Sequence, residues 1–163
     1  MPVTHVAHDA ERFSLTLTAE YKAPVERIWA LYADPRQLEK VFGPPSHPAT
    51  FVEHELRVGA VSKYFMTGPK GERYYGVWTL TSVDEPRAFG FEDGFADESF
   101  TLNTDMPVSN NVYSFEPIET GTRATYHAVY ASAEALQKVL DMGVIEGATT
   151  SLNQIDGHLQ TWR

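Results

Sequence analysis

Hydrophobic and polar residues alternate along residues 13–21, which predicts a strand. Every second position from Phe13 to Tyr21 is hydrophobic, and the positions between them are Ser, Thr or Glu. A period of two is typical of a strand that buries one of its faces. We take this segment as the first strand of the chain, preceded by a polar segment from Met1 to Arg12.

The spacing of hydrophobic residues then changes to that of two short helices. Pro24 suits the first turn of a helix, and apolar residues recur at intervals of three and four up to Tyr32. Asp34 can cap a second helix that begins at Pro35. The prolines of residues 43–48 are expected to stop that second helix.

Turn signals divide residues 50–130 into short strands. Dipeptides such as Val58-Gly59 and Asp93-Gly94 and isolated residues such as Pro86 are expected to break the chain. The connections are short, which implies antiparallel neighbours. With the first strand the chain is expected to contain seven strands, and the other six span residues 50–57, 60–67, 73–83, 87–92, 110–117 and 121–130.

The last part of the chain has a helical period. Ser132 can cap a helix, and apolar residues recur at intervals of three and four as far as Trp162. We expect one long amphipathic helix that packs its apolar stripe on the sheet. Gly143 and Gly147 lie one turn apart within it, and a kink, a break or a close approach is expected there.

Composition narrows the classes of function. A chain of 163 residues fits one domain, and the absence of cysteine excludes disulfides, thiolate metal ligands and cysteine nucleophiles. No apolar run approaches the roughly 20 residues that cross a bilayer, so we expect a cytoplasmic protein with no membrane insertion. The formal net charge is −9 and the basic residues do not cluster, which argues against binding to nucleic acid.

Six segments of the chain match the motifs of a known family in order and spacing. They are residues 23–29 (APVERIW), 56–60 (LRVGA), 66–71 (MTGPKG), 83–87 (VDEPR), 93–97 (DGFAD) and 142–147 (MGVIEG). From about Phe13 to Leu159 the sequence resembles the activator of Hsp90 ATPase homologue 1-like (AHSA1-like) family of the SRPBCC superfamily, which also holds START and Bet v1-like proteins. One departure is Gly59-Ala60, where the family commonly has two glycines.

The resemblance implies an α+β helix-grip fold. In this fold a seven-stranded curved antiparallel sheet wraps around a long C-terminal helix, two short helices follow the first strand, and a cavity lies between the sheet and the long helix. The resemblance implies no shared reaction, because proteins of one fold differ widely in activity.

Sequence motifs for catalysis and cofactor binding are absent. The chain has no Gly-rich nucleotide loop, no H-E-x-x-H, no G-x-S-x-G and no EF-hand loop, so no catalytic residue, metal or cofactor is predicted. His54 is the most interesting histidine, because its place in the strand predicted for residues 50–57 allows it to face a cavity. The remaining histidines, His158 among them, are expected at the surface.

Aromatic residues give the richest functional pattern. If the concave face of the sheet carries the alternating aromatic positions, their rings converge on the final helix around a mostly apolar cavity with tyrosine hydroxyls and an indole N–H as its polar groups. The candidate ligand-binding residues are His54, Tyr64, Met66, Tyr74, Trp78, Phe89, Phe91, Tyr113, Phe115, Tyr126, Met142 and Ile145. The acidic, glycine-containing run of residues 93–98 is interpreted as a solvated turn, with the mouth of a cavity or a cation site as the alternatives.

Three functions follow from these observations. The first is non-enzymatic binding of a small apolar or aromatic molecule in the cavity, as a sensor, carrier or protector, stress response included. The second, implied by the family, is docking on an Hsp90-type chaperone. The third, implied by cyclases and hydrolases in the superfamily, is an enzyme in the same cavity with His54 or a tyrosine as proton donor, which would need a strongly perturbed titrating group there. Formation of a homodimer is left open.

Overall fold

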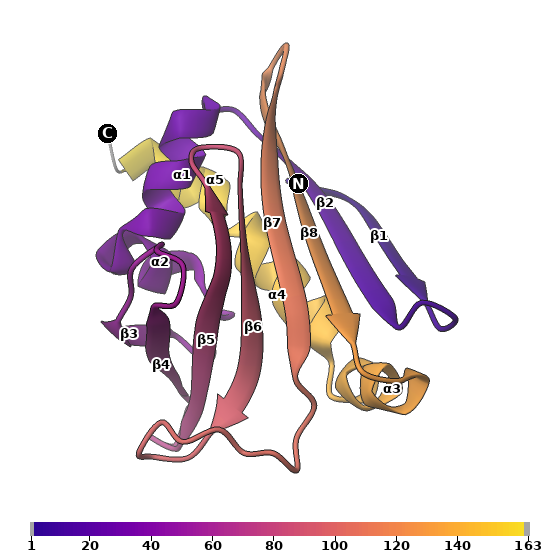
Figure 1. Ribbon diagram of the computed structural model, residues 1–163. Coiled ribbons are helices and arrows are strands. Elements are labelled where there is room, and N and C mark those ends of the chain that lie inside the picture. The colour runs from indigo at the N-terminus through magenta and orange to yellow at the C-terminus, as the bar shows by residue number, and fades with distance from the viewer. Residues whose placement is uncertain (1, 162–163) are drawn as a thin grey trace.

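The computed structural model describes residues 2–161, which form one curved antiparallel sheet with helices on its concave side (Figure 1). The order of the strands across the sheet is β1-β2-β8-β7-β6-β5-β4-β3. The strands are β1 Val3–Asp9, β2 Ser14–Tyr21, β3 Ala49–Glu53, β4 Val61–Thr67, β5 Arg73–Asp84, β6 Ala88–Ala96, β7 Ser109–Ile118 and β8 Gly121–Tyr130. The helices are α1 Val25–Ala33, α2 Pro35–Val41, α3 Ala133–Asp141, α4 Val144–Asn153 and α5 Ile155–Thr161.

The described residues form eight strands rather than the seven predicted, because β1 pairs along β2 at the edge of the sheet. No residue of β1 is buried, so the strand has no buried face that would require hydrophobic residues at alternate positions. What holds the strand is its backbone: Val6 pairs with Leu17, and the Val3 N–H donates to the Asn153 side-chain oxygen at 3.1 Å. An edge strand of this kind carries little sequence signal.

The two short helices follow β2 as predicted. The Asp34 side chain accepts a hydrogen bond from the Arg36 N–H at 2.9 Å, so it caps α2, and Pro35 is the first residue of that helix. Helix α1 buries Ile28 and Trp29 against the sheet, where the Trp29 ring meets Phe89 edge-on at a centroid distance of 5.8 Å. The helices α1 and α2 therefore fill one end of the concave face.

The C-terminal helix is broken into three segments. Gly143 has φ +87° between α3 and α4, a left-handed conformation that glycine adopts at little cost. Gly147, by contrast, lies within α4. Figure 1 shows α4 crossing behind β6, β7 and β8 and α5 lying behind α1 and β5, while α3 lies at the end of the sheet below β8. The break expected near these glycines is thus confirmed at the first of them.

Two predicted strand ends differ from the structure by more than one residue. Strand β3 ends at Glu53, because His54 turns inward toward α1. Strand β6 continues to Ala96, so Asp93-Gly94 is not a turn. Glycine stands at position 94 because Leu102 packs against it and a Cβ there would collide with the Leu102 side chain.

A cavity between the sheet and the C-terminal helices

A cavity of about 420 Å³ lies between the concave face of the sheet and the helices α3–α5. Leu15 and Leu17 of β2 line it on one side, and Val144, Ala148 and Leu152 of α4 line it on the other. The alternation of β2 sends both leucines to the same face, and the helical spacing of four aligns the three residues of α4. The cavity is therefore walled mainly by apolar side chains.

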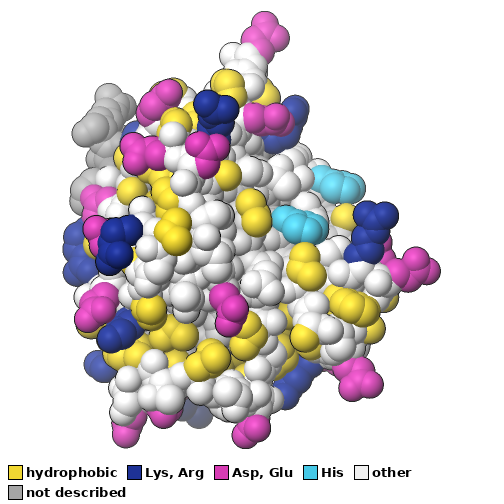
Figure 2. All heavy atoms as spheres, in the orientation of Figure 1, with side chains coloured by type: hydrophobic (Ala, Val, Ile, Leu, Met, Phe, Trp, Pro, Cys, Tyr) yellow, Lys and Arg dark blue, Asp and Glu magenta, His cyan; other side chains and the backbone are white. Residues whose placement is uncertain are grey.

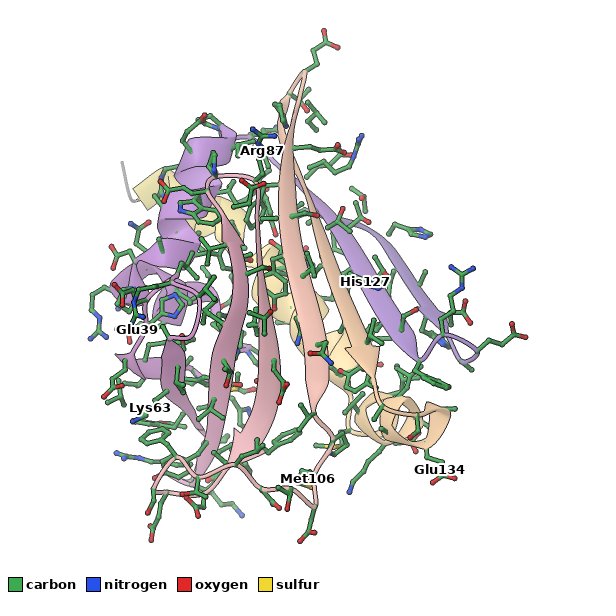
Figure 3. All side chains as sticks on the ribbon, in the orientation of Figure 1. Glu39, Lys63, Arg87, Met106, His127 and Glu134 are labelled. Atoms are coloured by element: carbon green, nitrogen blue, oxygen red, sulfur yellow. The ribbon has the colours of Figure 1, made fainter. Side chains whose placement is uncertain are left out.

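The cavity reaches the surface at the junction of α3 and α4. Met142 lines the cavity while 54% of its surface is exposed. Pro107, from the β6–β7 loop that Met106 marks in Figure 3, and Pro44, from the loop after α2, also line the cavity. Two loops thus contribute to the lining together with the break between α3 and α4.

The polar groups of the cavity centre on a carboxyl. Asp93 lies on the same face of β6 as Phe91, and its Oδ1 accepts a hydrogen bond from the Tyr64 hydroxyl at 3.0 Å. Tyr64 reaches across β5 at Gly76, its cross-strand partner, where a Cβ would collide with the tyrosine ring. The glycine in β5 is therefore what lets a side chain of β4 contact one of β6.

Burial changes the protonation of this carboxyl. Desolvation raises the pKa of Asp93 to about 7, although hydrogen bonds from the Tyr64 hydroxyl and the Gly94 backbone N–H oppose the rise. The same desolvation raises the pKa of Tyr64 well above its ordinary value, and the neighbouring Asp93 adds to the rise. Near neutral pH the cavity thus holds a carboxyl that can gain or lose a proton, beside a neutral phenol.

A second polar group in the cavity is a chain of three tyrosines. The Tyr126 hydroxyl lies 2.7 Å from the Tyr32 hydroxyl and 3.0 Å from the Tyr21 hydroxyl. Burial is the main reason that the pKa of each of the three phenols is raised above its ordinary value. The three hydroxyls are neutral and satisfy one another inside the core, and Tyr32 and Tyr126 also line the cavity.

The family model described as activator of Hsp90 ATPase homolog 1-like protein matches residues 22–160. The chain belongs to this family. A crystal structure of a Mycobacterium smegmatis protein is 66% identical, covers 96% of each chain and has a TM-score of 0.89. A solution structure from Arthrobacter aurescens is 41% identical over 98% of this chain and 92% of that chain, with a TM-score of 0.93.

A more distant structure, the AHSA1 protein of Silicibacter pomeroyi, is 22% identical over 92% of this chain and 99% of that chain, and its TM-score of 0.72 shows the shared fold alone. No curated protein matches the chain. Within residues 2–161, no helix is both long enough and apolar enough to span a bilayer. The helix-grip fold expected of the AHSA1-like family is confirmed.

The structure brings some of the candidate residues of this AHSA1-like chain together and not others. Five of the predicted ligand-binding residues line the cavity, namely Tyr64, Met66, Tyr113, Tyr126 and Met142. They come from β4, β7, β8 and the α3–α4 junction, so segments far apart in the sequence meet at one site. Their role in binding a ligand stays a prediction.

Four predicted aromatic residues lie in the packed core instead of the cavity wall. Helices α1 and α2 cover their part of the concave face, so rings fill the space there: Phe42, for example, meets the fully buried Trp78 at 5.3 Å. Trp78 stacks on Phe91 at 4.1 Å, and its indole N–H finds no hydrogen-bond acceptor among the described residues. The four residues are Trp78, Phe89, Phe91 and Phe115.

The last three candidates also lie outside the cavity lining. His54 follows the end of β3 and bonds to Ser62 and to the Tyr32 carbonyl. Tyr74 is 53% exposed at the rim, where its ring lies 5.8 Å from that of His47. Ile145 packs against the core from α4 without lining the cavity. The expectation of a solvated His158 is wrong, because that side chain is buried and its pKa is lowered chiefly by desolvation.

Sequence reasoning missed Asp93 as a cavity residue. The Asp-Gly pair has the composition of a turn, and only the alternation of Phe89, Phe91 and Asp93 carries the opposite signal. On the outer face, Figure 2 shows Lys and Arg side chains interspersed with Asp and Glu rather than gathered in a patch. Within residues 2–161, no group of three acidic or histidine side chains is arranged to hold a metal ion.

Proposed function

We propose that this AHSA1-like chain binds a small, largely apolar molecule in the cavity between the sheet and α4, without transforming it. The cavity volume of about 420 Å³ carries the proposal, because ligand pockets commonly measure about 300–1,000 Å³. Apolar walls with a few polar groups are the usual composition of such pockets. Tyr113 and the pair Tyr64 and Asp93 supply polar groups of this kind.

The proposal also accounts for the break in the C-terminal helix. Met142 and Gly143 line the cavity where α3 ends and α4 begins, and Met142 is also exposed to solvent. The break therefore supports access to the cavity from solvent.

A pair of glycine variants tests the proposal. Gly147 lies in α4 and lines the cavity, whereas Gly157 lies in α5 and does not; a Cβ would meet no atom within 4 Å at either position. Leucine improves helix propensity at both sites by about 1 kcal/mol, so Gly147→Leu and Gly157→Leu are matched for everything except the cavity. Each variant is compared with the unmodified protein by native mass spectrometry and by thermal shift against fatty acids, sterols, flavonoids and aromatic metabolites.

The expected result separates the two variants. A ligand at a hundred times its Kd stabilises the folded protein by about 2.7 kcal/mol, which gives a clear rise in Tm. This rise should persist in Gly157→Leu and fall sharply in Gly147→Leu. Equal shifts in the two variants would place binding elsewhere on the molecule, and no shift across the panel would reject the cavity as a binding site.

An enzyme in the same cavity is a second candidate, and Asp93 is the observation that favours it. A general acid works best when its pKa lies near the operating pH, and burial raises that of Asp93 to about 7. The two candidates differ in one measurement. A binding protein returns its ligand with unchanged mass after prolonged incubation, whereas an enzyme converts it, and Asp93→Asn would stop the conversion.

Docking on a chaperone is the candidate that the family description favours. Such docking would use the outer surface of the protein. A substitution that fills the cavity would therefore leave the docking unchanged. Titration of the chain into Hsp90 with measurement of ATP hydrolysis tests this candidate directly. A rate that does not change at any ratio of the two proteins would remove it.

A further inference from the structure

Among the residues that the structure describes, 2–161, the cavity contains one group that can carry a charge near neutral pH. Asp93 is the only carboxyl in this described lining, which includes no lysine, arginine or histidine. The other titratable side chains in the lining are tyrosines. A carboxylate in this position has no basic side chain to balance its charge, which makes ionisation costly in a mostly apolar setting.

The surroundings of Asp93 leave it able to accept further hydrogen bonds. The Tyr64 hydroxyl donates to Oδ1, and the Gly94 N–H is the other donor. An ionised carboxylate has about four acceptor positions, so capacity remains for a donor in the cavity. Tyr113 of β7 and Tyr130 of β8 are the titratable groups that face it from the neighbouring strands, and neither is cationic.

Building on the proposed function, we propose that the cavity takes a small hydrophobic amine in its protonated form, with the ammonium group on Asp93 and the apolar body against Leu15, Leu17 and Ala148. The ammonium would supply the positive charge that the protein itself does not provide, and it would donate to the free acceptor positions of the carboxylate. The faces of the surrounding tyrosine rings also attract a cation.

The alternatives to a cation fit the same residues less well. An acidic ligand would bring a second negative charge beside Asp93 with no basic side chain to offset either. A neutral ligand would displace solvent from the carboxylate without balancing its charge, and so would bind more weakly once Asp93 is ionised. The net charge of −9 adds a long-range attraction for cations.

Binding of an ammonium is coupled to loss of a proton from Asp93. In the empty cavity burial raises the pKa of Asp93 to about 7. A bound cation favours the ionised form, so below that pH each binding event releases close to one proton into solution. Affinity should therefore rise about tenfold for each pH unit up to about pH 7 and then stay constant until the amine itself loses its proton.

Isothermal titration calorimetry with three probes of one shape tests the proposal: 2-phenylethylamine, the neutral 2-phenylethanol and the anionic 3-phenylpropionate. The amine is expected to bind most tightly at pH 8 and to weaken toward pH 5. In Asp93→Asn its affinity should fall about 10- to 100-fold and lose its pH dependence, since the side-chain oxygen can still accept a hydrogen bond but no longer carries the negative charge. Glu92→Gln, which changes an exposed carboxylate on the other face of β6, is the matched control and should behave as the unmodified protein.

The outcomes separate this proposal from the one on which it rests. Equal affinity for the amine and the alcohol at pH 8 would overturn the choice of a cation while leaving the cavity as a binding site. Binding of a fatty acid, sterol, flavonoid or aromatic metabolite, but of none of the three probes, would also overturn the choice of a cation and leave the cavity as a binding site. Proton release, measured at pH 6 in buffers of different ionisation enthalpy, needs no variant, and a value near zero on binding of the amine would overturn the proposal even if Asp93→Asn fails to fold.

Discussion

The hydroxyl groups of Tyr32 and Tyr126 lie 2.7 Å apart and join helix α1 to strand β8. Tyr126 also contacts the Tyr21 hydroxyl at 3.0 Å, so it is the central member of the chain of three tyrosines. A hydroxyl carries one proton and two lone pairs, so Tyr126 can donate to no more than one neighbour and accepts from at least one when both bonds form. The arrangement satisfies three buried groups with two hydrogen bonds.

The central position makes Tyr126→Phe more damaging than Tyr21→Phe. Removing the Tyr126 hydroxyl leaves both neighbours without this partner, and an unsatisfied buried hydroxyl costs about 1–3 kcal/mol. We expect Tyr126→Phe to lower the free energy of unfolding by about 2–4 kcal/mol and Tyr21→Phe by about 1 kcal/mol. Urea denaturation measures the loss of unfolding free energy in both variants. Equal losses would contradict the prediction, because they would mean that the Tyr126 hydroxyl stabilises the fold no more than the Tyr21 hydroxyl does.

Asp93 should make the protein less stable as pH rises from about 4 to 7. The unfolded chain loses the proton of this carboxyl near pH 4, whereas the folded chain keeps it until about pH 7. Between these values the unfolded state is favoured progressively, and above them the cost is constant, up to about 4 kcal/mol. Asp93→Asn removes this cost and should therefore raise the stability at pH 8 relative to the unmodified protein.

The difference in unfolding free energy between the unmodified protein and Asp93→Asn, measured by urea denaturation from pH 4 to pH 8, isolates this carboxyl from all others. It should change steadily up to about pH 7 and then level off. Glu92→Gln, which changes an exposed carboxylate on the other face of β6, is the control. A flat difference for Asp93→Asn would mean that the carboxyl is solvated in the folded protein.

His54 should matter for stability and not for binding in the cavity. A carbonyl oxygen only accepts, so Nε2–H donates to Tyr32 O at 2.6 Å and Nδ1 accepts from the Ser62 hydroxyl at 2.7 Å. Burial lowers the pKa of this neutral imidazole. Its stabilising contribution is therefore present above about pH 6.5 and is lost as the pH falls through the lowered value.

His54→Ala should cost about 1–3 kcal/mol of unfolding free energy at pH 8, because the Tyr32 carbonyl and Ser62 hydroxyl lose their partner. The loss should be smaller at pH 5, where the unmodified protein has already given up part of this contribution. The affinity for any cavity ligand should stay the same. A variant that keeps its stability but loses ligand affinity would restore His54 to the binding site.

Substitutions at the two glycines of the C-terminal helix should act in opposite directions. Gly143 has φ +87°, where an L-residue is strained, so Gly143→Ala is expected to cost about 1–2 kcal/mol. Gly147 lies inside α4, where alanine is the better helix former, so Gly147→Ala should gain about 0.5–1 kcal/mol. Thermal and urea unfolding of the pair check the signs, and a stabilising Gly143→Ala would show that the break is not needed for the fold.

Much of the fold could be predicted because its local signals agree. The alternation of residues 13–21, the Asp34-Pro35 cap and the helical period after Ser132 each occur where the structure has the matching element. Strand β1 could not be predicted in this way, because backbone pairing rather than a buried face holds it. The AHSA1-like motifs then identified the arrangement that local patterns leave open.

The cavity was harder to predict than the fold. Alternation correctly sends Phe89 and Phe91 to the concave face, but it does not say which part of that face α1 will cover. Asp93 was not predicted to line the cavity, because the Asp93-Gly94 pair has the composition of a turn. In the structure Gly94 lies within β6 and makes room for the Leu102 side chain. Contacts between distant segments decide both cases, and no local pattern records them.

The pairing of β2 with β8 has a consequence for when this protein can first work in a cell. Residues made early, such as Leu15 and Leu17, form a wall of the cavity only after β8 and α4 have been synthesised. Ribosomes add residues from the N-terminus onward, and strand pairs far apart in sequence form late. A nascent chain that stops before Gly121 would therefore have no closed cavity, and no ligand could assist its folding until translation is nearly complete.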